Sequence, residues 1–368
     1  MTVTQLAEAA TLGALLLRPK PLDHVGTWLR AEDFADPWHR QIYAVLREKQ
    51  VAREPINPEV VGLDLLERVG PRRADLVRIV GVLTSTPAHA EPAVYGRMVL
   101  ESSLRRDVGL QGVLLRACAL SASLNHSSRP LTVGVAMVDQ ALREGEGRWQ
   151  LASGESSSAP TTHPELAPAL RNPHRFLAAD RLVFAHPELD FEEGRLSEQQ
   201  TVASLICHPD QLREVRSWLR PELLTDKRWR VAYEALLDLV DAGTSPVDAV
   251  TVAWQIQRST RRLGRGPDPA DLVRAVDSSV SIDPSFCARR VAENVVRRTA
   301  DSSARLLKSA ADNPGLEVPR LYETARVGTA ALLGTAGSLD GARGRGVHLQ
   351  AVPELAERVR EVVGPVAG

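Results

Sequence analysis

The feature that most constrains the fold is an internal repeat. Shifting the sequence by 190 positions places residues 6–46 on residues 196–236 without a gap. The residues of the first segment that are identical to their counterparts are Leu6, Glu8, Thr11, Leu15, Pro19, Leu22, Val25, Trp28, Leu29, Arg30, Glu32, Asp36, Arg40, Tyr43 and Leu46. The match continues after small length changes, because residues 74–78 recur as residues 270–274. The repeat therefore indicates a duplicated domain, since a solenoid needs more and shorter repeats.

The repeat and the composition predict four parts. These are a first copy at 1–150, a linker at 151–192, a second copy at 193–335 and a tail at 336–368. The linker begins with a run of serine, glycine and proline, which is typical of a flexible connection. Its residues 176–184 are more apolar and are expected to be able to dock on a domain. In the flexible tail, residues 353–363 form a short amphipathic segment, interpreted as a frayed helix or, alternatively, as a partner-docking peptide.

Both copies are predicted to be all-helical. Aromatic residues make up only 4% of the chain, so the cores must consist of leucine, valine and alanine, which favour helices. Asp36 followed by Pro37 predicts a helix start, and Ser197 with Gln200 has the spacing of a capping box. Each copy ends with two long helical stretches separated by a turn rich in asparagine and proline. The predicted unit is a helical head followed by an antiparallel helical hairpin.

The sequence offers no recognisable catalytic, cofactor or metal site. A phosphate-binding loop requires Gly-x-x-x-x-Gly-Lys-Ser/Thr, and none of the four lysines follows a glycine. The three cysteines are isolated and the nine histidines are scattered, so no spacing indicates a metal site or a disulfide framework. No apolar run is long enough to span a membrane. We expect a cytoplasmic protein that is not an enzyme and carries no cofactor.

Two sets of residues are candidates for binding. The arginine pairs Arg105-Arg106 and Arg297-Arg298 occupy equivalent positions, and either face solvent, form internal ion pairs, or make a basic patch for nucleic acid or an acidic partner. The formal net charge is −1, so DNA binding would need such a local patch. Trp28 and Trp218 also match, and either pack in the heads or anchor a partner.

The first copy resembles the N-terminal domain of DnaB-type replicative helicases. The resemblance is carried by "EAATLGALLL" at 8–17, "LDHVGTWLRAEDF" at 22–34 and "WHRQIYAVL" at 38–46, and by the tyrosine-bearing segment that begins at Tyr95. It implies that the domain is not a motor, and that its hairpins pair in a collar that docks the primase. A candidate partner interface follows, formed by Trp28, Phe34, His39, Tyr43, Tyr95, Trp218 and Tyr233.

The second copy departs from the family pattern. Glu-Asp-Phe becomes Glu222-Leu223-Leu224, Trp229 replaces His39, and Cys287 replaces Tyr95. We therefore expect the second copy to have lost some binding partners of the first. A second collar domain also stands where the motor would follow, which suggests a covalently linked pair able to associate through hairpins 95–145 and 286–335.

Three functions remain open at this point. The leading hypothesis is a replication-associated adaptor that binds the helicase collar, the primase or copies of itself. The alternative is a DNA-binding protein that uses the paired arginines together with Arg343 and Arg345 of the tail. The third is a degenerate helicase-family ATPase, which the missing phosphate-binding loop disfavours.

Overall fold

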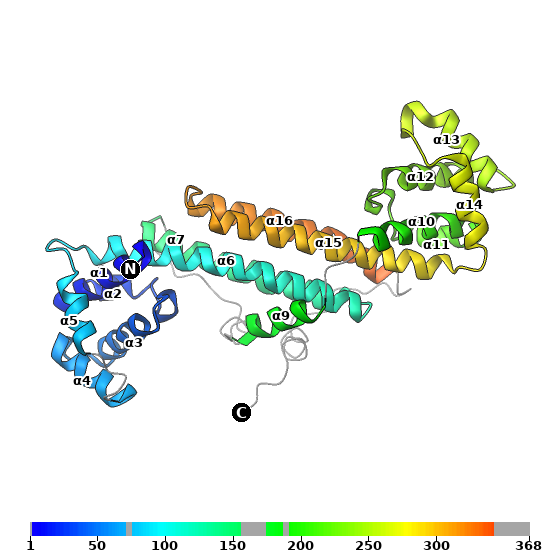
Figure 1. Ribbon diagram of the computed structural model, residues 1–368. Coiled ribbons are helices and arrows are strands. Elements are labelled where there is room, and N and C mark those ends of the chain that lie inside the picture. The colour runs from blue at the N-terminus through cyan, green and yellow to red at the C-terminus, as the bar shows by residue number, and fades with distance from the viewer. Residues whose placement is uncertain (1, 71–75, 156–173, 187–190, 342–368) are drawn as a thin grey trace. The chain divides into compact units, whose positions relative to one another are not determined.

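The chain folds into helices throughout the part that the computed structural model describes, which comprises residues 2–70, 76–155, 174–186 and 191–341 (Figure 1). No strand occurs within these ranges. The all-α prediction is therefore confirmed, as is the prediction of two helical heads that each lead into a hairpin. Residues 156–173 of the predicted linker and the amphipathic segment 353–363 lie outside the described residues, whereas residues 151–153 belong to the helix Arg129–Ser153.

The first head consists of α1 and the helices around it. The elements are α1 (Val3–Leu17), α2 (Leu22–Val25), η1 (Ala31–Asp33), α3 (Pro37–Ala52), α4 (Pro58–Val69) and α5 (Leu76–Thr84). Helix α1 packs against both α3 and α5. The approach to α5 is close, since a Cβ on Gly13 would lie 2.9 Å from the carbonyl oxygen of Val82. Every residue of α1 from Ala7 to Leu16 is buried, so α1 is the central helix of the head.

The second head repeats this plan. Its elements are α10 (Phe191–Cys207), η2 (Pro209–Gln211), α11 (Leu212–Val215), η3 (Pro221–Leu223), α12 (Lys227–Asp241), α13 (Ala249–Leu263) and α14 (Pro269–Ser279). Helix α10 packs against α12 and α14, as α1 does against α3 and α5. Ala203 stands where the first head has Gly13, and it is fully buried.

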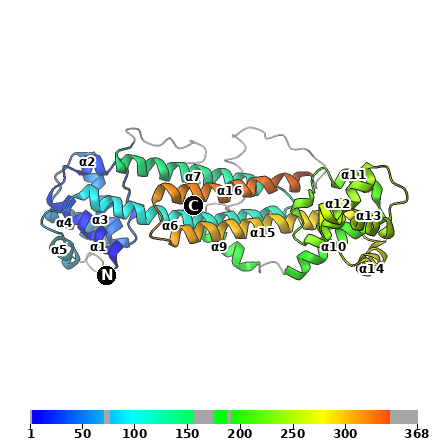
Figure 2. The ribbon, with the colours of Figure 1, turned by 90° about the horizontal axis from the view of Figure 1, so that it is seen from above.

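Each head leads into two long helices. The first hairpin consists of α6 (Pro92–Leu124) and α7 (Arg129–Ser153), and the second of α15 (Pro284–Asp312) and α16 (Val318–Gly341). Figure 2 shows α15 beside α16, and the Ser303 hydroxyl on α15 donates to the Gly328 carbonyl oxygen on α16 at 2.9 Å. In the first hairpin the helices approach closely near Cys118, because a Cβ on Gly134 would lie 2.4 Å from its Sγ atom.

The compact units of the structure do not coincide with the two sequence repeats. One unit comprises Met1–Leu110, Asp139–Pro164 and Leu307–Arg326, so it holds the first head together with the turn of the second hairpin. The other comprises Gln111–Val138, Glu165–Leu306 and Val327–Gly368, so it holds the second head together with the turn of the first hairpin. Each unit therefore contains hairpin segments from both copies.

The helix starts follow the sequence signals in the first copy more closely than in the second. The Asp36 side chain accepts a hydrogen bond from the Trp38 amide at 2.7 Å, which confirms it as the N-cap of α3. The capping box predicted at Ser197 is wrong, because α10 already begins at Phe191. The Ser197 hydroxyl instead donates to the Glu193 carbonyl oxygen, four residues earlier. Glu192 and Glu193 lie in the first turn of α10, where acidic side chains stabilise a helix, and the helix continues through Gly194.

The predicted linker contains one described helix, α9 (His174–Ala185). It covers the apolar stretch that the sequence singled out. Ala179 and Arg175 are buried, whereas Phe184 is 91% exposed. The stretch is thus helical, with one face covered and its last aromatic side chain open to solvent.

A tyrosine bonds the same backbone atom in both heads. The Tyr43 hydroxyl donates to the Leu29 carbonyl oxygen at 3.1 Å, and the Tyr233 hydroxyl donates to that of Leu219 at 3.0 Å. Both tyrosines are fully buried, and burial raises the pKa of each phenol above its usual range. The bond ties α3 or α12 to the loop after the second helix of the head.

We expect Tyr43→Phe and Tyr233→Phe to destabilise their heads by similar amounts, about 1–3 kcal/mol each, because each leaves a buried carbonyl oxygen without its partner. Urea unfolding followed by circular dichroism measures the loss. Tyr95→Phe is the control, since Tyr95 is only half-buried. A cost confined to Tyr43→Phe would contradict the equivalence of the two heads.

Candidate interaction sites

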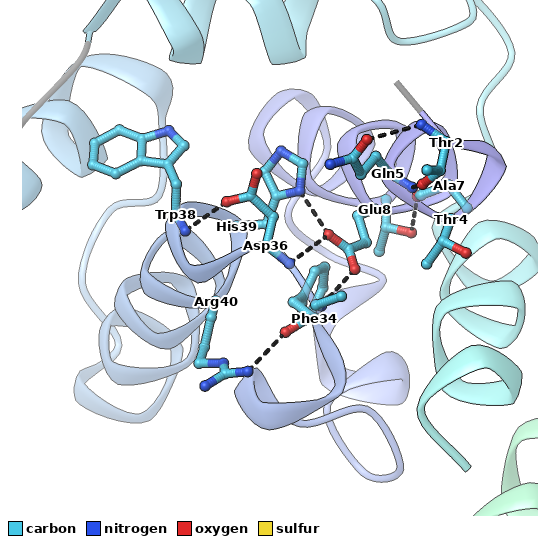
Figure 3. A network of polar contacts seen from close by, with 12 residues as sticks. Thr2, Thr4, Gln5, Ala7, Glu8, Phe34, Asp36, Trp38, His39 and Arg40 are labelled. Carbon is cyan, nitrogen blue, oxygen red and sulfur yellow. Dashed lines mark hydrogen bonds and ion pairs between the residues drawn. The ribbon is translucent and has the colours of Figure 1, made fainter. Parts of the chain in front are cut away.

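A buried carboxylate organises the first head (Figure 3). The Glu8 side chain on α1 is fully buried and accepts hydrogen bonds from the backbone amides of Ala35 at 2.6 Å and Asp36 at 3.3 Å. The Nδ1 atom of His39 lies 2.8 Å from the same carboxylate. A carboxylate removed from water needs such partners to offset its lost hydration. Glu8 thus joins α1 to the loop before α3 and to the first turn of α3.

The second head keeps this carboxylate and exchanges its side-chain partner. Glu198 is equally buried and accepts hydrogen bonds from the Thr225 hydroxyl at 2.6 Å and the Asp226 amide at 2.8 Å. Trp229 occupies the place of His39, and Arg298 on α15 donates to Glu198 at 3.2 Å instead. The loss of the histidine is therefore compensated by an arginine from the hairpin.

Asp36 and Asp226, which cap α3 and α12, each also pair with an arginine. Arg78 on α5 lies 2.8 Å from Asp36, and Arg195 on α10 lies 3.3 Å from Asp226. Burial by itself would raise the pKa of Asp36, but the Trp38 amide, His39 and Arg78 together hold it below its usual value. Asp226 has a lowered pKa for the same reasons, with Arg228 and Arg195 outweighing burial. These carboxylates are structural.

A buried ion pair connects the first head to its hairpin. Asp33 and Arg148 form it, with side chains 2% and 6% exposed. Asp33 also accepts hydrogen bonds from the Arg30 amide at 2.6 Å and the Ser103 hydroxyl at 2.8 Å. The Arg148 Nε atom donates to the Trp28 carbonyl oxygen at 2.9 Å. Neither residue was among the predicted candidates, although the change of Asp33 to Leu223 between the copies is a signal that could have revealed the site.

The structure corrects the predicted partner interface. Six of its seven side chains are buried, at 0–6% exposure: Trp28, Phe34, His39, Tyr43, Trp218 and Tyr233. Phe34 and Tyr43 pack ring to ring at 4.9 Å, and Trp28 fits against Gly96 at the start of the hairpin. The five aromatic residues other than His39 form the cores of the heads, because their large apolar surfaces are removed from water there, and His39 is buried as the partner of Glu8. Only Tyr95 is partly accessible, and its role stays a prediction.

Apolar surface is exposed elsewhere on the first head, on the outer helices α4 and α5. Leu63, Val77 and Val80 are 61%, 79% and 57% exposed. These three residues were not predicted, because the residues that carry the family resemblance are core residues.

The first predicted arginine pair is engaged within the structure. Arg105 donates to Glu101 on its own helix and to the Asn313 carbonyl oxygen at 2.7 Å. Arg106 donates to the Asp33 carbonyl oxygen at 2.5 Å. The internal-contact interpretation therefore applies to both, and they are not a free patch for a polyanion.

The second pair is engaged as well. Arg298 bonds Glu198 and the Thr225 hydroxyl. Arg297 is partly buried, which lowers its pKa, and the carboxylates of Asp301, Glu193 and Glu293 act in the opposite direction. Carboxylates of the chain itself therefore interact with both guanidinium groups.

Within the described residues, no group of three histidine, cysteine, aspartate or glutamate side chains is placed to hold a metal ion. No described helix is long and apolar enough to cross a membrane. Burial raises the pKa of the Cys118 thiol to about 12, so this cysteine stays protonated in the core.

The fold defines a class of protein in which one chain contains two domains, each made of a helical head and a helical hairpin. The buried polar residues described above hold these domains together. Comparison with protein families gives the same answer: the DnaB-like helicase N-terminal domain matches twice, at residues 2–101 and 194–293. Together these ranges cover more than half of the chain, which therefore belongs to this family. Comparisons with curated proteins and with solved structures give no match. The family associates the chain with replicative helicases through their N-terminal domain, which is not the motor.

We expect His39→Ala to destabilise the first head by about 1–3 kcal/mol, because Glu8 then keeps only its backbone partners in a buried site. Adding Glu8→Gln to His39→Ala removes the buried charge and is expected to recover part of the loss. His89→Ala is the control, since His89 is exposed. Chemical unfolding measures all three variants, and an equal effect of His39→Ala and His89→Ala would contradict the role assigned to the pair.

Proposed function

We propose that the chain is a non-catalytic, replication-associated adaptor that binds other proteins through its helical domains. Its partners are a replicative helicase collar, a primase or further copies of itself. The observation that carries the proposal is the presence of two copies of the helicase N-terminal domain in one chain. The predicted division into copies at 1–150 and 193–335, joined by a linker at 151–192 and followed by a tail at 336–368, is part of it.

Contacts between the two hairpins support association of the copies within one molecule. In the first compact unit, Arg105 of α6 donates to the Asn313 carbonyl oxygen in the turn of the second hairpin. Glu146 of α7 pairs with Arg326 of α16 in the same unit. These are the contacts expected when a hairpin of one copy packs on a hairpin of the other.

The second compact unit contains a comparable set. Arg116 of α6 lies 2.6 Å from Asp301 of α15. Gly112 and Ala304 stand six residues after Arg106 and Arg298, so they are equivalent positions of the two copies. A Cβ on Gly112 would lie 3.1 Å from the Ala304 Cα atom. Contact between equivalent positions is typical of two like helices that pack symmetrically on each other. The copies would thus satisfy internally the pairing that separate subunits otherwise provide.

The test is light-scattering mass of the chain alone and mixed with the replicative helicase of the same organism, with the primase in a parallel mixture. The adaptor proposal predicts a larger complex in at least one mixture. A helicase without its N-terminal domain is the matched control and is expected not to bind. No complex with either protein at micromolar concentration, and no self-association, would rule out the proposal.

Direct DNA binding is the weaker candidate, because Arg105, Arg106 and Arg298 already contact carbonyl or carboxylate groups of the chain. Anisotropy of a labelled duplex across a salt series tests it. Binding that weakens steeply with salt and is lost in Arg105→Ala/Arg106→Ala would favour DNA over a protein partner.

A further inference from the structure

The second head contains an open groove that neither the family nor the proposed function accounts for. The groove has a volume of about 1170 Å³ and lies between α12, α13 and the segment that leads into α14. Its lining includes Leu239 and Ile256, both 8% exposed, which form an apolar floor. Gly266 closes onto this floor, since a Cβ there would lie 2.9 Å from the Ile256 side chain.

One rim of the groove is apolar and open to solvent. Val250 and Trp254 lie one turn apart on α13, and their side chains are 70% and 62% exposed. Trp28, Trp38, Trp218 and Trp229 are all buried in the heads, so the exposure of Trp254 is unusual in this chain. Tryptophan is one of the residue types most enriched at the binding hot spots of protein interfaces, so an exposed tryptophan beside a groove is a candidate anchor for a bound protein.

Three arginines and three aspartates line the groove, but not all of them have partners of opposite charge. Its carboxylates are engaged: Asp238 pairs with Arg262, Asp268 caps α14 through the Ala270 amide, and Asp271 lies 2.9 Å from Arg274. Arg258 and Arg265 also line the groove, and neither forms a hydrogen bond or ion pair with another described residue. Two arginines next to an apolar rim therefore have no direct acidic partner among the described residues.

The first head does not share this combination. Leu63 on α4 stands at the position of Trp254 on α13 and is just as exposed, at 61%. Its helix carries Asp64 and Glu67 nearby, whereas α13 contains arginines and no acidic residue. The exposed apolar position is thus common to both copies, while the basic character belongs to the second alone.

We propose that this groove binds an acidic peptide segment of a partner protein, one that carries a bulky apolar side chain. The apolar side chain packs against Trp254 and Val250 over the floor of the groove, and the acidic residues pair with Arg258 and Arg265. A protein segment fits better than single-stranded nucleic acid, because the single exposed tryptophan of the groove cannot stack a run of successive bases.

The experiment measures fluorescence anisotropy of labelled peptides of about 12 residues with the full chain. The first peptide mixes aspartate and glutamate with leucine and phenylalanine, the second has lysine in place of the acids, and the third has serine in place of the apolar residues. We expect the first to bind with a Kd below about 100 µM, and the other two to bind at least about ten-fold more weakly. Trp254→Ala and Arg258→Glu/Arg265→Glu are each expected to weaken the first peptide about ten-fold or more.

The controls separate this proposal from its competitors. Leu63→Ala, the matched change in the first head, is expected to leave peptide affinity within about two-fold. All substituted side chains are exposed, so unchanged unfolding curves will show that the variants are folded. Failure of the first peptide to bind, equal binding of the lysine peptide, or no effect of Trp254→Ala would each overturn the proposal. So would displacement of the peptide by an oligothymidine of about 20 nucleotides.

A chain that ends at Val352 tests for an internal occupant. If only this shortened chain binds the first peptide, the groove is covered by the chain's own end, and the assignment to a partner is overturned. Equal binding by both chains supports the partner. The peptide experiment uses synthetic peptides and neither helicase nor primase. Its failure can therefore be distinguished from failure of the adaptor test.

Discussion

Arg148→Ala is expected to cost about 3–5 kcal/mol of unfolding free energy, because it leaves the Asp33 carboxylate charged and unpaired in a buried site. The loss exceeds that of an ordinary hydrogen bond, since Asp33 stays in place and cannot regain water. The Trp28 carbonyl oxygen loses its partner in the same variant. Urea unfolding with fits for more than one transition is the appropriate measurement, because the chain contains two compact units.

The second copy indicates which second substitution should restore the stability lost in Arg148→Ala. Leu223 stands at the position of Asp33, so an apolar residue is compatible with this place in the fold. Asp33→Leu combined with Arg148→Leu is therefore expected to be more stable than Arg148→Ala alone, because apolar pairs often replace buried ion pairs at little cost. Arg143→Ala is the matched control on the same helix. It breaks an exposed pair with Asp139, and its expected cost is below about 0.5 kcal/mol. Similar losses from Arg143→Ala and Arg148→Ala would refute the assignment.

Most of the fold could be predicted from the sequence, because the same helical pattern occurs in both copies. Two copies of one helical pattern place the same apolar residues in the same core, and matched residues such as Tyr43 and Tyr233 make the same hydrogen bond. Proline after an acidic residue marked the start of α3 correctly. The start of α10 was misplaced because the pattern at Ser197 is also compatible with a helix interior, where a serine hydroxyl bonds back to an earlier carbonyl.

The candidate sites were harder to predict, because the residues of a family motif are mostly those that the core of the fold needs. Residues that bind partners at the surface contribute less to such motifs. Phe34 and His39 carry the resemblance and are buried. The arginine pairs were identified as candidates, but their partners are distant in sequence: Arg105 reaches Asn313, and Arg298 reaches Glu198. Spacing along one helix does not reveal such contacts. The exposure of Trp254 was equally hidden, since a tryptophan at helical spacing is usually a core residue.

Gly112→Ala and Gly109→Ala are expected to shift stability in opposite directions, although both replace glycine within α6. Alanine stabilises a helix interior by about 1 kcal/mol relative to glycine, and this gain should appear at Gly109. A Cβ at Gly109 would lie 3.7 Å from the Ala311 side chain, an ordinary contact. At Gly112 the new atom would meet the Ala304 backbone at 3.1–3.2 Å, which cannot move aside as a side chain can. Gly112→Leu extends the conflict, with an expected cost of about 1–3 kcal/mol or more.

The same pair of substitutions tests whether the hairpins associate within one chain. If α6 packs on α15 of its own molecule, Gly112→Leu lowers the unfolding temperature and changes the light-scattering mass or radius at low concentration, where association between chains is negligible. Gly109→Ala raises the unfolding temperature and leaves both unchanged. If α6 is free of α15 in solution, both glycines are plain helix positions and both alanine variants are stabilised alike. Equal stabilisation would therefore remove the internal pairing from the adaptor proposal, while binding to a helicase collar would remain to be judged by the mixing experiment.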